Sequence, residues 1–170
     1  AFENVYESFL INYERDEDAE YQQPAILYIG SNSAIDNSYF QDLVQWRKER
    51  GYVVYTATTS QTGSSSGSIK SYIEDAYDTW SPRPEFVTLI GDDGGSYSDI
   101  PTFFENWSGY NGEGDHPYTQ LEGDDIMGEI FLGRISVRNT NELNVISNKI
   151  LHYEKATYIG STGTDWYEGA

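Results

Sequence analysis

Continuous apolar runs that alternate with helical stripes constrain the fold of this chain more than any other feature. The run "PAILYIG" is apolar from Ala25 to Ile29 and closes at Gly30, which is typical of a strand buried on both faces. Runs of the same kind cover residues 52–58, 86–90 and 130–137. Helical spacing covers residues 39–50, 68–80 and 140–157 between and after these runs.

This alternation predicts an α/β fold in three layers, with a mainly parallel four-stranded sheet and helices on both faces. Right-handed crossovers favour a doubly wound sheet with strand order 2-1-3-4. Sites in such folds gather where the strands end, at their carboxyl edge. In this chain that edge carries residues 30–32, 56–59 and 91–93.

The three expected helices differ in how clearly their ends and buried faces can be predicted. Ser38 is the expected N-cap of the first helix, and Gly51 is expected to end it. The second helix has the clearest apolar stripe, made by Ile69, Tyr72, Ile73, Ala76, Tyr77 and Trp80. The inward residues expected in the last helix are Leu143, Ile146, Ile150 and Tyr153.

Charge and cysteine content exclude several classes of function. The formal net charge is -18, from 28 acidic and 10 basic residues. Nucleic acids and anionic membranes are therefore unfavourable partners, because their phosphates would be repelled. No apolar run approaches the length of a membrane span. The chain has no cysteine, so it can supply neither a disulfide nor a thiolate nucleophile.

A long stretch between the third and fourth strands, from Asp93 to about Glu122, is rich in Gly, Ser, Asn and aromatic residues. It is expected to be irregular, and it is too long for an ordinary connection, which indicates a functional or docking segment. His116 lies within it, and His152 lies in the last helix. Two histidines at this separation form no recognisable metal pair, and both are expected to be structural or solvated.

Acidic residues flank the third and fourth strands and form the strongest candidate for a site. If these strands are neighbours, both acidic groups reach the same rim, where calcium could take its six to eight oxygen ligands. The predicted metal ligands are Asp92, Asp93, Asp115, Asp124 and Asp125. Arg134, in the fourth strand, is an alternative partner for these carboxylates. Solvated surface charge and a carboxylate pair for acid–base chemistry are further alternatives.

Several segments resemble the gingipain family of cysteine peptidases. The resemblance is carried by "FVTLIGD", "DIPT", "YTQLEGDDIMGEIFLGRISVRNTNEL" and "NKILHYEKATY", which follow one another along the chain. Earlier segments agree with it, namely "PAILYIG", "LVQWRKERGYVVYTATT" and "IKSYIEDAYDTW". The lead-in "YESFLINYE" resembles the join between the propeptide and the catalytic unit of that family.

The resemblance implies a caspase-like pair of α/β subdomains, of which this chain resembles the first; its fold is equally described as flavodoxin-like. The family's catalytic His and Cys belong to the second subdomain, and no position here matches them. Residues 1–23 are then a lead-in segment, residues 24–160 the α/β subdomain, and residues 161–170 the start of a link to the catalytic subdomain. Structural calcium in the family adds to the prediction of a calcium site.

The resemblance therefore implies the N-terminal, non-catalytic subdomain of a gingipain-like cysteine endopeptidase, secreted or on a bacterial cell surface. Its partners would be the C-terminal catalytic subdomain of the same parent chain and the peptide or protein substrate. An alternative is a stand-alone, calcium-stabilised binding domain on a cell surface. A third is a metal-assisted hydrolase that uses the carboxylate cluster.

Overall fold

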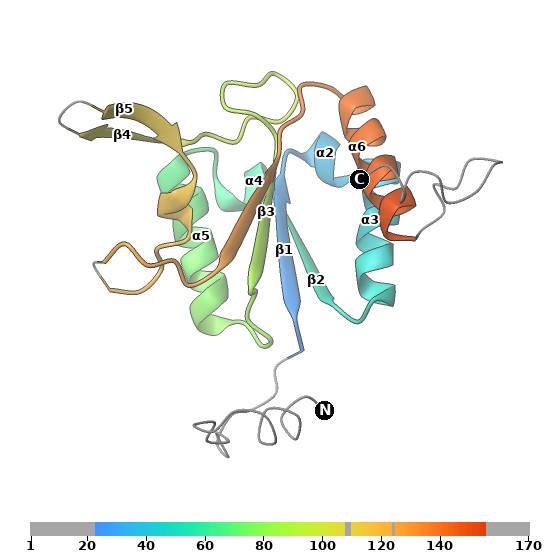
Figure 1. Cartoon of the computed structure of the whole chain (residues 1–170), viewed down its shortest axis with the longest axis horizontal. Helices are drawn as coiled ribbons and strands as arrows, with labels where there is room; N and C mark the ends of the chain where they lie inside the picture. The colour runs from blue at the N-terminus through green and yellow to red at the C-terminus, as the bar shows by residue number, and fades with distance from the viewer. Residues whose placement is uncertain (1–22, 108–109, 124, 156–170) are drawn as a thin grey trace, which may run out of the picture.

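The computed structural model describes residues 23–107, 110–123 and 125–155. Its centre is a four-stranded sheet in the order β2-β1-β3-β6, in which every neighbouring pair is parallel. The strands are β1 (Ala25–Gly30), β2 (Val53–Thr58), β3 (Phe86–Ile90) and β6 (Phe131–Ile135). The expected strand order 2-1-3-4 is therefore confirmed, as is the three-layer α/β class (Figure 1).

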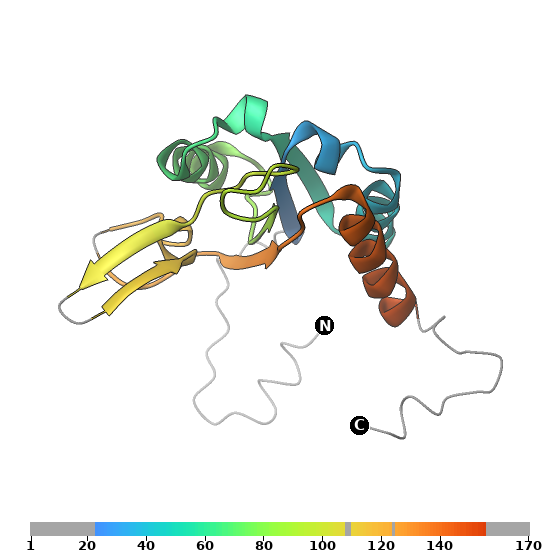
Figure 2. The same ribbon diagram turned by 90° about the horizontal axis from the view of Figure 1, so that it is seen from above.

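Helices cover both faces of this sheet. One face carries α2 (Asn32–Ile35), α3 (Ser38–Glu49) and α6 (Thr140–Glu154). The other carries α5 (Ser66–Thr79), and the four-residue helix α4 (Thr59–Thr62) follows β2. Figure 2, seen from above, shows α3 and α6 on one side of the strands and α5 on the opposite side.

Alternation along β1 builds the two halves of the core. Ile26 and Tyr28 point to the cluster under α3 and α6, whereas Leu27 and Ile29 point to the cluster under α5. All six residues of β1 are buried, as expected for a strand covered on both faces. Burying an aliphatic side chain of this size stabilises a fold by roughly 1.5–3 kcal/mol, so the central strand contributes strongly to folding.

Helix boundaries agree with the predictions to within about two residues at most ends. The first helix is capped by Asn37 rather than by Ser38, because the Asn37 side chain accepts a hydrogen bond from the Phe40 amide at 3.0 Å. Gly51 follows that helix with φ 92°, a conformation that glycine adopts readily. The last helix is described as far as Glu154, and residues 156–157 of the predicted range lie outside the described residues.

The buried face of α6 differs from the prediction. Leu143, Ser147 and Leu151 are buried, while Tyr153 is exposed. The helix packs chiefly on α3, and Asn144 accepts a hydrogen bond from Asn37 of the α3 cap at 2.8 Å. Packing on α3 therefore sets which face of α6 is buried, and Ile146 and Ile150 are only half-buried.

The stretch between β3 and β6 is more regular than predicted. It contains an antiparallel hairpin, β4 (Phe103–Trp107) with β5 (Tyr110–Gly114), and a 3-10 helix η1 (His116–Tyr118). The hairpin projects from the body of the molecule (Figures 1 and 2). Its base is held by Phe103, whose ring lies 4.8 Å from that of Tyr118. The sequence missed it because "YNGEG" lacks both β-branched residues and apolar alternation.

The expected lead-in, residues 1–23, lies outside the described residues except for Gln23. The expected link, residues 161–170, lies outside them entirely. Within the described ranges, no helix has the length and apolar character that crossing a membrane would require.

Candidate functional site

The crevice between the carboxyl ends of β1 and β3 is where a doubly wound sheet ordinarily binds its ligand. Here the loop after β3 fills it with a side chain of its own. Ser98 is 1% exposed; its hydroxyl donates to the Ile90 carbonyl at 2.5 Å and accepts from the Ser31 amide at 2.9 Å. The amide of Ser31, the N-cap residue of α2, is thus already bonded to Ser98.

Gly91 makes this loop possible. Its φ is 143°, in the region that side-chain-bearing residues rarely adopt. A Cβ at this position would lie 2.2 Å from the Ser98 carbonyl oxygen. The chain therefore passes so close to itself after β3 that only glycine fits, which keeps Ser98 in the crevice.

Arg134 of β6 organises the same rim. Its Nε donates to Asp115 Oδ2 and its Nη2 donates to Asp115 Oδ1, each at 2.7 Å. Its Nη1 donates to the carbonyl oxygens of Ile100 at 2.8 Å and of Gly91 at 3.1 Å. One guanidinium therefore joins the edge strand to the loop after β3 and to the segment after the hairpin. The predicted pairing of Arg134 with a rim carboxylate is confirmed.

Burial and the charge of Asp115 shift the pKa of the Arg134 guanidinium in opposite directions. Burial alone would lower the pKa of Arg134, but the hydrogen bonds and charge of Asp115 raise it above its usual value. Arg134 thus stays charged across the whole range of folding conditions. The neighbouring Tyr118 is fully buried, which raises its pKa to about 12, and its hydroxyl donates to the Pro101 carbonyl at 2.6 Å.

The predicted metal ligands have separate partners. Asp93 accepts from the Thr102 amide at 3.2 Å, and Asp125 accepts from the Met127 amide at 2.7 Å within its own turn. Asp115 is held by Arg134, and the backbone of Asp92 forms a bridge with Asp99. Asp124 lies outside the described residues.

Among the described residues, no three His, Asp or Glu side chains come together as metal ligands would. The arrangement found at Asp115 is the alternative in which arginine neutralises the carboxylate. Calcium binding at Asp92, Asp93, Asp115, Asp124 and Asp125 stays a prediction.

The two histidines lie in different elements, His116 in η1 and His152 in α6. The Nε2 atom of His116 lies 2.9 Å from the Ile126 carbonyl oxygen, and its Nδ1 atom lies 3.4 Å from the Thr119 hydroxyl. These contacts connect η1 to the loop before β6. His152 is exposed on α6, as predicted.

Sequence reasoning missed the residues that close the rim. Ser98 lies in a polar loop with nothing to distinguish it from its neighbours, and Tyr118 is one of 15 tyrosines. The sequence feature that could have indicated the close approach of the backbone at Ser98 was Gly91, which directly follows a buried strand. What these residues do chemically is to hold loops in place through hydrogen bonds to the backbone.

Comparison with known proteins agrees with this reading of the fold. Residues 19–169 match the sequence profile of Peptidase family C25. The chain belongs to this family. Gingipain R2 of Porphyromonas gingivalis is 24% identical over 159 residues, which are 91% of this chain and 20% of that protein. Lys-gingipain of the same organism is 30% identical over 122 residues, 66% of this chain and 6% of that protein.

Solved structures show the same fold. The crystal structure of the Arg-specific cysteine proteinase gingipain R superposes with a TM-score of 0.64 at 24% identity, covering 83% of this chain and 30% of that one. A complex of the pro- and mature domains of the Porphyromonas gingivalis enzyme gives a TM-score of 0.63 at 23% identity. The C25 chain described here therefore spans a fifth or less of the curated relatives and about a third of the solved chains.

Proposed function

We propose that this chain is the N-terminal, non-catalytic subdomain of a gingipain-like cysteine endopeptidase. One combination of observations carries the proposal: nearly the whole chain matches a cysteine peptidase family, yet it contains no cysteine. The nucleophile of such an enzyme must then come from another part of a longer polypeptide. The shares covered in the relatives are consistent with a part of a larger catalytic unit.

In the parent enzyme, a histidine would accept the proton of a cysteine thiol, and the resulting thiolate would attack the peptide carbonyl to form an acyl-enzyme. Both groups would lie outside this chain. The role of this subdomain would be to hold the catalytic subdomain in position and to contribute part of the surface over which the substrate lies. The position of Ser98 supports that role, because its hydroxyl bonds the Ser31 amide, a donor that a ligand at this edge of the sheet would otherwise use.

The proposal extends to location and partner. We place the parent outside the cell or on a bacterial cell surface, and we name its C-terminal catalytic subdomain as the partner of this chain. The resemblance to gingipains supports both statements. Fractionation of the source cells with an antibody against this chain tests the location, and recovery in the cytoplasmic fraction would contradict it.

The test of function compares two purified polypeptides. One is the 170-residue chain, and the other is the longer product of the parent reading frame. We expect the longer product to hydrolyse peptides and to lose that activity on treatment with iodoacetamide. A parent that hydrolyses no peptide, or one without a downstream cysteine, would overturn the proposal and favour a binding domain.

A further inference from the structure

We infer that the cavity at the amino ends of the strands, beside the loop that joins α5 to β3, binds a neutral saccharide. This end of the sheet lies opposite the rim that Arg134 organises. The inference goes beyond the proposed function and does not depend on it, because it uses no catalytic group. It rests on the segments that form the cavity, the fixed position of its walls and the chemistry of the side chains that line it.

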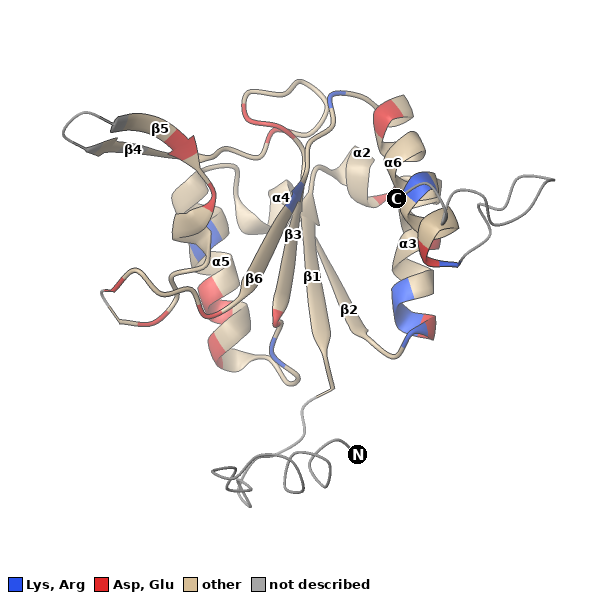
Figure 3. Cartoon of the chain, in the orientation of Figure 1, with Lys and Arg blue, Asp and Glu red and all other residues tan. Residues whose placement is uncertain are grey.

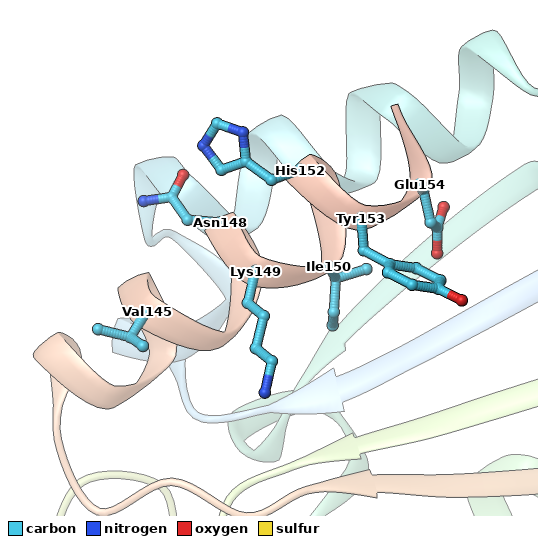
Figure 4. A pocket seen from close by; sticks show the side chains of 7 residues that line it. All are labelled: Val145, Asn148, Lys149, Ile150, His152, Tyr153 and Glu154. Atoms are coloured by element: carbon cyan, nitrogen blue, oxygen red, sulfur yellow. The ribbon is translucent and has the colours of Figure 1, made fainter. Parts of the chain in front are cut away.

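Segments that are far apart in the sequence meet around this cavity. Gln23 lies just before β1, Glu85 just before β3 and Glu129 just before β6, and Asp78 belongs to the last turn of α5. The volume is about 760 Å³, within the roughly 300–1,000 Å³ of small-molecule sites. The hollow along α6 differs, because its lining residues all come from that one helix (Figure 4). A cavity bordered by several segments can contact a ligand from more than one side, which the side of one helix cannot.

Hydrogen bonds to the backbone hold the walls of this cavity in place. The Glu85 amide donates to the Ala25 carbonyl at 3.1 Å, and the Phe131 amide donates to the Glu85 carbonyl at 2.9 Å. The Tyr55 hydroxyl donates to the Pro82 carbonyl at 3.1 Å. Figure 1 shows the loop between α5 and β3 beside the start of β1. Because this loop is already fixed to the sheet, little further ordering is needed when a ligand binds.

Two aromatic side chains give the cavity an apolar part. Trp80 is half-buried, with the rings of Tyr55 and Tyr72 at 4.6 and 5.8 Å from its own in edge-to-face arrangements. Tyr77 is also half-buried, and the Arg83 guanidinium lies 4.5 Å from the centre of its ring. A sugar ring has a face of C–H groups, which packs well on an aromatic side chain that has polar groups beside it.

Charge around the cavity disfavours ionic ligands. Asp78, Glu85 and Glu129 contribute three carboxylates, against the one guanidinium of Arg83. The Leu121 amide donates to Glu129 at 2.6 Å and holds the pKa of that carboxyl below its usual value, so its charge persists at neutral pH. Figure 3 shows acidic residues along α5 and both signs of charge at the lower end of β3. The carboxylates therefore repel phosphorylated ligands, and Arg83 disfavours a cationic one.

Neutral hydroxyl groups match the remaining chemistry. A hydroxyl both donates and accepts, so it can pair with carboxylates, which only accept, and with the Arg83 guanidinium, which only donates. Hydrogen bonds that involve a charged group are also stronger than those between neutral groups. A saccharide combines such hydroxyls with a C–H face in one rigid ring, and it therefore fits the charged and the aromatic parts of the cavity together.

Nuclear magnetic resonance of the isotope-labelled 170-residue chain tests the inference. The probes are maltose, cellobiose and N,N′-diacetylchitobiose, each added to about 10 mM, because a site with a Kd of about 1 mM is then mostly occupied. At least one of them should shift the Trp80 indole signal and the amides of residues 77–85, and leave the amides of α6 unchanged. Absence of shifts with all three, or shifts confined to other regions, would overturn the inference.

Two substitutions remove charged partners while keeping side chains of similar size. Asp78→Asn and Arg83→Gln should each raise the Kd of the bound disaccharide at least about tenfold, since each loses a hydrogen bond to a charged group. Asp75→Asn is the matched control on the same helix, because Asp75 is exposed and does not border the cavity. Arg138→Gln is the control for Arg83, with a side chain that is 77% exposed. Thermal melts check that each variant is folded, and equal weakening in the controls would contradict a site at this cavity.

Competition experiments identify the source of the saccharide and exclude other ligands. A glycopeptide that displaces the disaccharide, when the same peptide without its glycan does not, identifies a glycan attached to a protein. Displacement by free oligosaccharides alone identifies a free one, and either result supports the inference. Displacement by the unglycosylated peptide would overturn it in favour of a peptide groove. Tighter binding of a sugar phosphate than of the neutral sugars would overturn it in favour of an anion site.

Discussion

Arg134 and Asp115 form a doubly hydrogen-bonded ion pair, with both nitrogen–oxygen distances at 2.7 Å, across 19 residues of sequence. The same guanidinium donates to the Ile100 and Gly91 carbonyls and, at 3.5 Å, to the Pro101 carbonyl, so five acceptor atoms converge on one side chain. A half-buried acceptor that loses its donor is left partly unsatisfied, which costs far more than an exposed ion pair contributes. Arg134 is therefore the residue on which the rim depends most.

Arg134→Ala should destabilise the chain by about 2–4 kcal/mol, because it leaves a carboxylate and two carbonyls without their donor. Urea unfolding of the 170-residue chain measures this directly. Arg138→Ala is the matched control: its side chain is 77% exposed and pairs with Glu142 at 3.8 Å, so a change within about 0.5 kcal/mol is expected. Equal effects of the two substitutions would contradict the account of the rim.

Gly91→Ala should lower the free energy of unfolding by about 2–4 kcal/mol, since its Cβ would meet the Ser98 carbonyl at a φ that alanine avoids. Gly133→Ala adds the same atom to open space and should change stability by less than about 1 kcal/mol. Thermal or urea unfolding compares the pair. A tolerated Gly91→Ala would show that the loop after β3 can move away from the crevice.

Tyr118 should make the fold sensitive to alkaline pH. Burial raises its pKa from 10.0 to about 12, so the folded state holds the phenol proton more tightly than the unfolded chain does. This contribution is complete below about pH 10 and is lost as pH rises toward 12; it amounts to at most about 3 kcal/mol. Tyr118→Phe should flatten that part of the stability curve, whereas Tyr39→Phe, on the exposed face of α3, should not. Parallel curves for all three proteins would contradict the prediction.

Calcium should raise the melting temperature if the predicted carboxylates bind it, because a ligand specific to the folded state stabilises that state by mass action. The measurement is a melt in millimolar calcium against EDTA, with magnesium as control. Asp125→Asn should reduce the effect, since the substitution removes one charge from a loop that the ion would have to organise. Superimposable curves with and without calcium would contradict the predicted calcium site.

The sheet and its order were predictable because burial on both faces leaves an unmistakable pattern. In "PAILYIG" every residue is apolar, and such a strand can only be central. Helix α5 was predictable for a similar reason, since Ile69, Ile73 and Ala76 repeat on one face and all are buried. The positions of these elements can be predicted from local sequence alone.

Elements that depend on contacts between distant segments were harder to predict. The buried face of α6 differs from the predicted one because α6 packs beside α3. The spacing of apolar residues within α6 carries no information about that contact. The hairpin was missed because its base depends on Phe103 meeting Tyr118. At the rim, the charge of Arg134 and the acidic cluster were visible in the sequence, but the choice of Asp115 as partner needed the three-dimensional path of the loops.

We propose that this chain supports a thiol peptidase whose nucleophile lies elsewhere in the same polypeptide. The most direct measurement is iodoacetamide-sensitive turnover of peptides by the parent product, combined with mass mapping of the alkylated cysteine. The account predicts that turnover is lost in step with alkylation of one cysteine beyond residue 170, and that the 170-residue chain alone has no turnover. Peptide hydrolysis by that purified chain, unaffected by iodoacetamide, would contradict the claim.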